Sequence, residues 1–363
     1  MVTGLVAAVF VLIFLSWAVF RRSPVTIPCA GPDELAEAAS VLNRYGGTGH
    51  SHLSFLGDKR LFWSTNRDAF IQYSLIRDRM VALGDPCGNE NVSDILVVAF
   101  REYADRHNVT PCFYEVDESA LHRYHDAGFS LFKLGESALV DVNAFTLNGK
   151  RGESVRHAVN RAKRAGVQFS WLQHPLPAAT WQALRAISDH WLQQRNAAEK
   201  GFSLGAFNEA YLARSEIAVV TVNERIVAFA NLMPDYARHR ELSIDLMRHY
   251  EDAPPGTMDF LFVNLIEYAR AQNYTWLNLG MAPLSGVGES PYARKTEKVA
   301  RLAYEYGNRF YNYKGLRKFK EKFHPVWRSS YLAYPVLSPL PALLIDIAAL
   351  IAGSYRFMAL RKN

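Results

Sequence analysis

The spacing of apolar side chains predicts alternating strands and helices from residue 32 onwards. Short apolar runs bounded by Gly, Pro or Asn are typical of strands, and apolar residues three and four positions apart are typical of helices. The expected strands are 69–75, 80–84, 112–116, one or two within 129–142, 217–221, 226–232, 241–247 and 275–279. The expected helices are one that opens at Pro32, and 93–108, 154–165, 178–194 and 258–271. This alternation predicts an α/β (α+β) fold class.

The second half of the chain has a more specific order of elements. Three strands follow one another from residue 217, and Pro254-Pro255-Gly256 then leads into a helix and a further strand. This is the order of the acyltransferase fold of the N-acetyltransferase (GNAT) type. Arg44–Gly49 fits the R-x-x-G-x-G pattern that holds the pyrophosphate of acetyl-CoA, but it follows a helix and not the central strand. A CoA donor is therefore disfavoured.

Two apolar segments lie near the ends of the chain. Residues 4–20 carry no charge and are followed by Arg21-Arg22, which predicts an uncleaved transmembrane anchor with the rest of the chain in the cytoplasm. A cleaved signal peptide is the alternative. Residues 331–353 are also apolar, but prolines break their first half, and 342–352 are too short to span a bilayer. We expect a packed or interfacial helix there, with a second span as the alternative.

Composition narrows the class of partner. The chain has 363 residues, enough for two domains, with a net charge of +6 that suits a polyanion or an anionic membrane. Cys29, Cys87 and Cys112 have no ligand spacing, which indicates buried thiols in a reducing compartment. The histidines do not sit with acids in a ligand pattern, so we expect no metal site.

Polar residues alternate with apolar ones in the strand expected at 241–247. Alternation places Glu241, Ser243 and Asp245 on one face, and Arg248 follows at the strand end. Polar groups on one strand face beside a cleft are typical of a site. The solvated face of a half-exposed sheet has the same pattern, so the pattern leaves both interpretations open.

Basic residues gather in two helical segments. In 315–323, Leu316, Phe319 and Phe323 form an apolar stripe, and Lys320 lies beside it, which predicts that this lysine points inward. The alternative is that the aliphatic part of the Lys320 side chain packs on the core while its ammonium group stays in water. The helix at 154–165 presents a basic arc that suits a nucleic acid backbone or anionic lipid, and a solvated charged face is the alternative.

Several stretches match a known family closely. They are Lys133-Leu-Gly-Glu136, Ser243-Ile-Asp-Leu-Met-Arg248, Gly280-Met-Ala-Pro-Leu-Ser-Gly286 and Phe310 to Phe323. In these stretches the chain resembles the cytosolic synthase domain of the aminoacyl-phosphatidylglycerol synthases, the family of phosphatidylglycerol lysyltransferase and multiple peptide resistance factor. The resemblance runs from about residue 30 to about residue 350. The family often carries many membrane spans ahead of this domain, so the apolar segment at 4–20 is also interpretable as the stub of a longer membrane domain.

The resemblance implies tandem GNAT-like domains and a set of site residues. The expected parts are an anchor (1–25), a first GNAT-like domain (26–145), a second, catalytic one (146–330) and a C-terminal apolar segment (331–363). Catalytic roles are implied for Asp245, Arg248 and Lys320. Substrate-binding roles are implied for Lys133, Glu136, Ser243, Gly280 and Met281. Binding of tRNA or lipid is expected from Arg156, Arg161, Lys163, Arg164, Arg317 and Lys318.

The implied reaction is a transesterification between an aminoacyl-tRNA and the head-group hydroxyl of phosphatidylglycerol. One ester replaces another, so no cofactor is expected, and the protein has to position two substrates. The expected partners are aminoacyl-tRNA, phosphatidylglycerol and the anionic inner membrane, whose negative charge the product would reduce, giving resistance to cationic antimicrobial peptides. A peptide or peptidoglycan acceptor and a non-catalytic membrane-tethered module are the alternatives. The sequence leaves open the amino acid (lysine, alanine, ornithine or arginine) and the oligomeric state.

Overall fold

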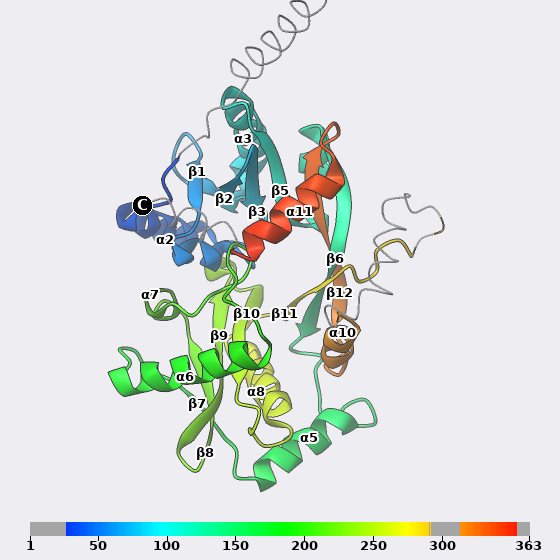
Figure 1. Ribbon diagram of the computed structural model, residues 1–363. Coiled ribbons are helices and arrows are strands. Elements are labelled where there is room, and N and C mark those ends of the chain that lie inside the picture. Colours follow the sequence, from blue (N-terminus) through cyan, green and yellow to red (C-terminus); the bar gives the residue numbers. More distant parts are fainter. Residues whose placement is uncertain (1–26, 290, 292–312, 354–363) are drawn as a thin grey trace, which may run out of the picture.

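A single mixed β-sheet runs through the protein, with helices on both sides (Figure 1). The computed structural model describes residues 27–289, 291 and 313–353. The strands follow the order β1-β2-β3-β5-β12-β6-β11-β10-β9-β8-β7, and β4 pairs with β2 outside this path. Their bounds are β1 (Arg60–Trp63), β2 (Ala69–Ile76), β3 (Arg79–Leu83), β4 (Cys87–Gly88), β5 (Thr110–Asp117), β6 (Phe129–Asp141), β7 (Gln168–Trp171), β8 (Ile217–Val222), β9 (Arg225–Pro234), β10 (Glu241–His249), β11 (Trp276–Pro283) and β12 (Val326–Pro335).

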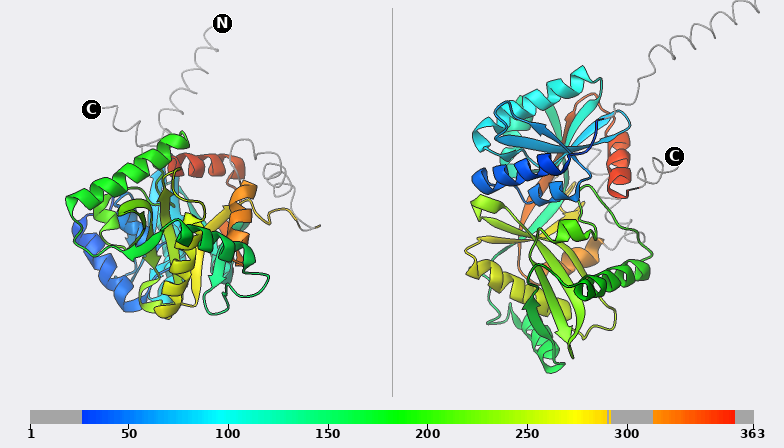
Figure 2. Two further views of the ribbon diagram at one scale, coloured as in Figure 1. Left: turned by 90° about the horizontal axis from the view of Figure 1, so that it is seen from below. Right: turned by 90° about the vertical axis from the view of Figure 1, so that its left-hand side faces the viewer.

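The helices connect and cover these strands. They are α2 (Pro32–Tyr45), α3 (Ser93–Arg106), α4 (Leu121–Asp126), α5 (Glu153–Arg164), α6 (Ala178–Gln194), α7 (Glu209–Leu212), α8 (Thr257–Ala271), α10 (Tyr313–Glu321) and α11 (Leu340–Ile351). In Figure 2 (right), α8 lies on one side of the sheet, and α6 and α11 lie on the other. Short 3-10 turns include η1 (Ser51–Leu56) and η3 (Glu118–Ala120).

The two halves of the chain repeat one pattern and share strands. In each half an antiparallel set leads through a helix to a parallel neighbour, β3 to β5 through α3 and β10 to β11 through α8. The next strand of each half then pairs with the other half, because β6 lies beside β11 and β12 lies beside β5. β6 and β12 also pair with each other along most of their length. This exchange joins both halves into one sheet, and β12 crosses the expected boundary at residue 330.

The sequence predicted most of these elements. The mixed α/β class is confirmed, and the 129–142 segment forms the single strand β6. The short edge strands β1 and β7 were missed, as was β12, whose polar residues 328–330 hid its strand character. Cys87 and Cys112 are buried as expected, whereas Cys29 is exposed.

The membrane predictions fall partly outside the described residues. The expected anchor at 4–20 lies outside them, and none of the helices in the described ranges is long and apolar enough to cross a bilayer. The C-terminal apolar segment forms the end of β12 and then α11, which buries Leu343 and Ile347. Asp346 of α11 is buried and accepts a hydrogen bond from Arg79 at 2.7 Å. α11 is therefore packed on the protein through one face.

Candidate functional site

β10 and β11 separate in the middle of the sheet. They pair in parallel only from Glu241–Trp276 to Ser243–Asn278, and both strands then carry a register shift. Gly280 follows on β11 with a φ of +84°, a conformation that side-chain-bearing residues rarely adopt. The backbone of β11 beyond Asn278 is therefore free of β10, and its carbonyl groups are available to a side chain.

Lys320 of α10 reaches this opening. Its Nζ donates hydrogen bonds to the carbonyl oxygens of Gly280 at 2.8 Å and Met281 at 3.0 Å. The side chain points inward as predicted, because the residue is only 3% exposed. Burial lowers the pKa of Lys320 to about 7, against the opposing effect of Glu115. A neutral amine has two N–H donors and one lone pair, so with both donors used by carbonyls the lone pair remains to accept a proton.

Asp245 faces the same side of the sheet as Glu241 and Ser243, as the alternation predicted. Its Oδ2 accepts from the Tyr211 hydroxyl at 2.7 Å, and its Oδ1 accepts from the backbone N–H of Gly205 at 2.8 Å. Burial raises the pKa of this carboxyl, with Tyr211 and Gly205 opposing. Through these two hydrogen bonds Asp245 ties β10 to the 205–211 segment.

Arg248 is also engaged by the protein. It is 4% exposed, and its two terminal nitrogens each lie 2.7 Å from an oxygen of Glu199. It also donates to the Ser188 hydroxyl of α6, and its guanidinium lies 5.4 Å from the centre of the Trp191 ring. This fork geometry fixes Glu199 and α6 on β10.

The Lys133-x-x-Glu136 pair forms part of a larger network. Lys133 lies 2.8 Å from Glu136, whose other oxygen accepts from Ser285 at 2.9 Å and from Arg317 at 2.7 Å. A Cβ at Gly286 would lie 2.2 Å from Glu136, so this position needs glycine. The structure therefore brings Lys133 and Glu136 together with Arg317, which the sequence had grouped with the tRNA- or lipid-binding residues.

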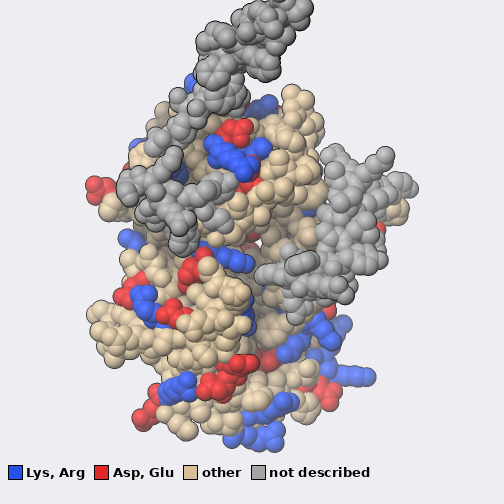
Figure 3. Space-filling model, in the orientation of Figure 1, with Lys and Arg blue, Asp and Glu red and all other residues tan. Residues whose placement is uncertain are grey.

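The other predicted basic residues lie on helix surfaces. α5 buries Val155 and Val159, and its last turn carries the exposed residues Arg161, Lys163 and Arg164. Lys and Arg gather over the end of the molecule that carries α5 (Figure 3). Arg156 instead donates to nearby carbonyl oxygens, including that of Gly149 at 3.1 Å. Lys318 is exposed on α10.

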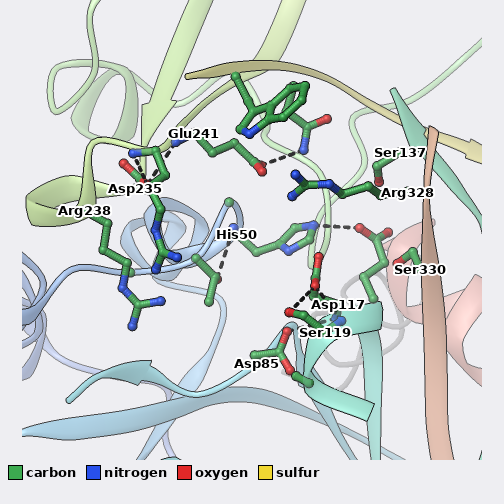
Figure 4. Close-up of a pocket in the computed structure, with 18 of the residues that line it drawn as sticks. His50, Asp85, Asp117, Ser119, Ser137, Asp235, Arg238, Glu241, Arg328 and Ser330 are labelled. Carbon is green, nitrogen blue, oxygen red and sulfur yellow. Dashed lines mark hydrogen bonds and ion pairs between the residues drawn. The ribbon is translucent and has the colours of Figure 1, made fainter. Parts of the chain in front are cut away.

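A pocket of about 600 Å³ lies between the two halves of the chain, beside this opening (Figure 4). The central strands contribute Glu241, Asn278 and Arg328. The first half contributes Glu115 from β5 and His50 from the turn before η1. The predicted site residues above do not line it, and Glu241 is the one residue of the polar strand face predicted at 241–245 that lies in its walls. The glycine-rich turn at 46–49, set aside because it follows a helix, contributes Gly47 and Gly49 to the wall.

His50 and Glu115 form an ion pair in the wall of this pocket. His50 Nε2 lies 2.7 Å from Glu115 Oε2. Burial lowers the pKa of His50, but the neighbouring carboxylates of Glu115, Glu241 and Asp85 outweigh it, so the pKa is raised. Glu115 also opposes the lowering of the Lys320 pKa, which places that lysine within electrostatic reach of the pocket.

The fold is of the mixed α/β, GNAT-like class, and comparison with known proteins identifies the family. A crystal structure of FemX matches 89% of this chain and 100% of that one, with a TM-score of 0.52. The two sequences are 10% identical, so this match shows a likeness of fold alone. Residues 39–334 match the family model described as the C-terminal domain of phosphatidylglycerol lysyltransferase. The chain belongs to this family, as the resemblance in the sequence implied.

Individual relatives agree with this assignment. The chain is 38% identical over 351 residues to a phosphatidylglycerol lysyltransferase of Bacillus subtilis, covering 96% of this chain and 40% of that relative. A solved structure of L-PGS from Bacillus licheniformis is 41% identical, with a TM-score of 0.78, over 90% of this chain and 98% of that one. A solved C-terminal domain of a putative lysylphosphatidylglycerol synthetase from Agrobacterium fabrum is 37% identical, with a TM-score of 0.79, over 88% of this chain and 97% of that one. The chain thus spans less than half of the curated relative.

Proposed function

We propose that the protein transfers an aminoacyl group from aminoacyl-tRNA to the head-group hydroxyl of phosphatidylglycerol. The observation that carries the proposal is the buried Lys320, held by two carbonyl groups at the opening between β10 and β11. Relatives named phosphatidylglycerol lysyltransferase support lysine as the amino acid and phosphatidylglycerol as the acceptor. The product would reduce the negative charge of the membrane and give resistance to cationic antimicrobial peptides.

Lys320 acts as the general base in this proposal. The lipid hydroxyl gives its proton to the neutral amine, and its oxygen forms a new ester bond with the aminoacyl carbonyl carbon. The bond from that carbon to the tRNA ribose oxygen breaks, and the ribose oxygen takes the proton from the Lys320 ammonium. Protons and bonds balance over the cycle, so the reaction consumes no energy source. The ammonium that forms during attack also stabilises the negative charge on the carbonyl oxygen.

Asp245, Arg248, Lys133 and Glu136 are positioning residues in this scheme. Asp245 and Arg248 hold the covering segments on β10 through Gly205 and Glu199. Because β10 forms one side of the opening, their loss would shift the walls against which Lys320 acts.

Two surfaces suit the two substrates. The exposed cations of α5, Arg161, Lys163 and Arg164, suit the phosphates of tRNA. On the lipid side, Leu337 is 93% exposed and Ile345 is 64% exposed, beside the packed face of α11. Apolar side chains of this exposure suit contact with a membrane surface, together with the expected anchor at 4–20. The site would then work at the cytoplasmic face of the inner membrane.

A reconstituted transfer assay tests the proposal. The full chain is mixed with radiolabelled lysyl-tRNA and vesicles that contain either phosphatidylglycerol or only phosphatidylethanolamine. We expect label in the lipid extract only with phosphatidylglycerol. We also expect loss of that label with Lys320→Arg, because arginine can still donate to the two carbonyl groups but stays protonated and cannot act as a base near neutral pH. Lys322→Arg, a matched change at a lysine paired with Asp259, is expected to keep activity. Label on neither lipid with a folded protein would refute the proposal.

A further inference from the structure

Helix α11 presents an exposed face that is apolar throughout. The exposed residues of the helix are Pro341, Ile345 and Ala348, and Leu337 in the turn before it is 93% exposed. The charged side chain of the helix, Asp346, is 1% exposed and lies on the opposite, packed face. An apolar face of this kind is typical of a surface that meets a lipid bilayer or another protein.

A bilayer is the occupant that fits this face. The acceptor of the proposed reaction is a lipid, and the uncharged run at 4–20 is expected to hold the chain at a membrane. A helix that lies in the bilayer interface buries an apolar face and keeps its charged groups on the other side. α11 has this arrangement, because its Asp346 accepts from Arg79 on the protein side.

The last turn of α11 is bonded to the loop that follows α6 (Figure 1). The backbone N–H of Gly201 donates to the carbonyl oxygen of Ile351 at 3.0 Å. Glu199 also lies close to this end of the helix, since a Cβ added at Gly353 would be 3.9 Å from its carbonyl oxygen. Residues 199–205, termed the strap, form neither helix nor strand.

The other contacts of the strap lead to β10. Gly205 donates its backbone N–H to Asp245 at 2.8 Å, and Glu199 accepts from both terminal nitrogens of Arg248 at 2.7 Å each. β10 forms one side of the opening that Lys320 reaches. The strap therefore connects the helix with the apolar face to the strand beside the proposed base.

The conformation of the strap depends on partners outside it. Phe202 has a φ of +61°, a region that bulky residues rarely adopt and that the surrounding structure has to enforce. This residue is 1% exposed, and its backbone N–H donates to Asp58 Oδ2 at 3.0 Å. A segment without secondary structure of its own, held by separate partners at Ile351, Asp58 and Asp245, is loosened when one of them moves.

We propose that contact of α11 with a lipid surface holds the strap on β10 and thereby activates transfer. The proposal rests on the proposed function and adds its regulation: the site is fully assembled only when the enzyme lies on a membrane. A bilayer favours this state because it covers the apolar face of α11 while the helix is packed with its last turn against the strap. Away from the surface the strap loosens, and Asp245 and Arg248 lose the partners that fix β10.

A soluble acceptor separates this coupling from the delivery of lipid. The full chain is placed in vesicles of phosphatidylethanolamine and phosphatidylcholine with lysyl-tRNA. The acceptor is glycerophosphoglycerol, the head group of phosphatidylglycerol without acyl chains, which reaches the site from water. The surface variant, Leu337→Ser with Ile345→Ser, is expected to lower kcat by roughly fivefold or more with little change in the KM of this acceptor. An unchanged kcat would overturn the proposal, because it would limit α11 to lipid delivery.

An equal loss of apolar surface elsewhere is the matched control. Ile95 and Val98 of α3 are 72% and 44% exposed, and Ile95→Ser with Val98→Ser is expected to keep kcat. Hydrogen exchange followed by mass spectrometry reads the strap directly, through the protected N–H groups of Gly201, Phe202 and Gly205. We expect roughly fivefold faster exchange of the strap in the surface variant and an unchanged rate in the control. Equal exchange in the surface variant and the unaltered protein would overturn the proposal.

Gly201→Pro tests the route of the coupling, because proline has no N–H to donate to Ile351. In this background the surface variant should lower kcat little further. Two effects that multiply in full would show that α11 acts by another route and would overturn the proposal. Near-ultraviolet circular dichroism shows whether each variant is folded, and the exchange of the surface variant decides the coupling if Gly201→Pro does not fold.

The outcomes separate this proposal from the proposed function. Absence of transfer to both phosphatidylglycerol and its soluble head group by the unaltered protein would refute the proposed function, and the exchange rates would still decide the coupling. Sedimentation of the protein in detergent tests the other occupant. A dimer that the surface variant converts to a monomer would show that a second copy of the chain covers the face of α11, and this would overturn the lipid assignment.

Discussion

The buried Lys320 makes a quantitative prediction about stability. Its pKa falls from 10.5 to about 7 on folding. This difference of about 3.5 is equivalent to about 5 kcal/mol, at about 1.4 kcal/mol for each pH unit. Between pH 7 and 10.5 the unfolded chain binds more protons than the folded chain, so this lysine makes stability rise with pH across that window. Below pH 7 the full cost of burying the ammonium applies.

Replacement of Lys320 by Met removes this titration. The variant also leaves the carbonyls of Gly280 and Met281 without their donor, but that loss does not depend on pH. We therefore expect the unfolding free energy of the variant minus that of the unaltered protein to fall by about 1.4 kcal/mol for each pH unit from pH 7.5 to 9.5. Urea titrations followed by circular dichroism at several pH values measure this difference. A difference that stays constant with pH would refute a lowered pKa for Lys320, and with it the base assigned to the reaction.

Three further predictions follow from the site. The transfer rate should rise with pH to a plateau above about pH 7, because the Lys320 base must be neutral, and a rate independent of pH from 6 to 8 would contradict this. Gly205→Ala should lower the free energy of unfolding by more than about 2 kcal/mol in urea titrations, because its Cβ would lie 1.9 Å from the Asp245 carboxylate. An unchanged urea midpoint would show that the backbone around Gly205 can move to make room for the methyl group. Replacing Arg161 and Lys163 by Gln should weaken tRNA binding and reduce the slope of log K against log salt concentration by about 1.5, because each lost phosphate contact contributes about 0.7–0.9 to that slope. An unchanged slope would mean that the tRNA binds elsewhere.

The sequence predicted those parts of the structure that local pattern determines. Lys320 follows Leu316 by four residues and lies beside an apolar stripe, so helical geometry alone brought it inward. Glu241, Ser243 and Asp245 share a face because side chains alternate along a strand. The exchange of β6 and β12 between the two halves was not predictable, since strand pairing over such sequence distances has no local signal.

The roles of the polar residues depended on partners far away in the chain. Catalytic roles were predicted for Asp245 and Arg248, but their hydrogen-bond partners Tyr211 and Glu199 have no signal in the local sequence pattern. The pocket was not predicted for the same reason. His50 directly follows the glycine-rich turn at 46–49, which was discounted because it follows a helix. Only the folded chain brings these residues beside Glu241.

Mass spectrometry of lipid extracts tests the central claim most directly. The chain would be produced in a bacterium that lacks aminoacyl lipids, beside Lys320→Arg and Asp245→Asn variants at matched protein levels. We predict a new mass for aminoacyl-phosphatidylglycerol that also identifies the amino acid, abolished by Lys320→Arg and strongly reduced by Asp245→Asn. No new lipid from well-folded, membrane-associated protein, or the same lipid at full level with Lys320→Arg, would contradict the account.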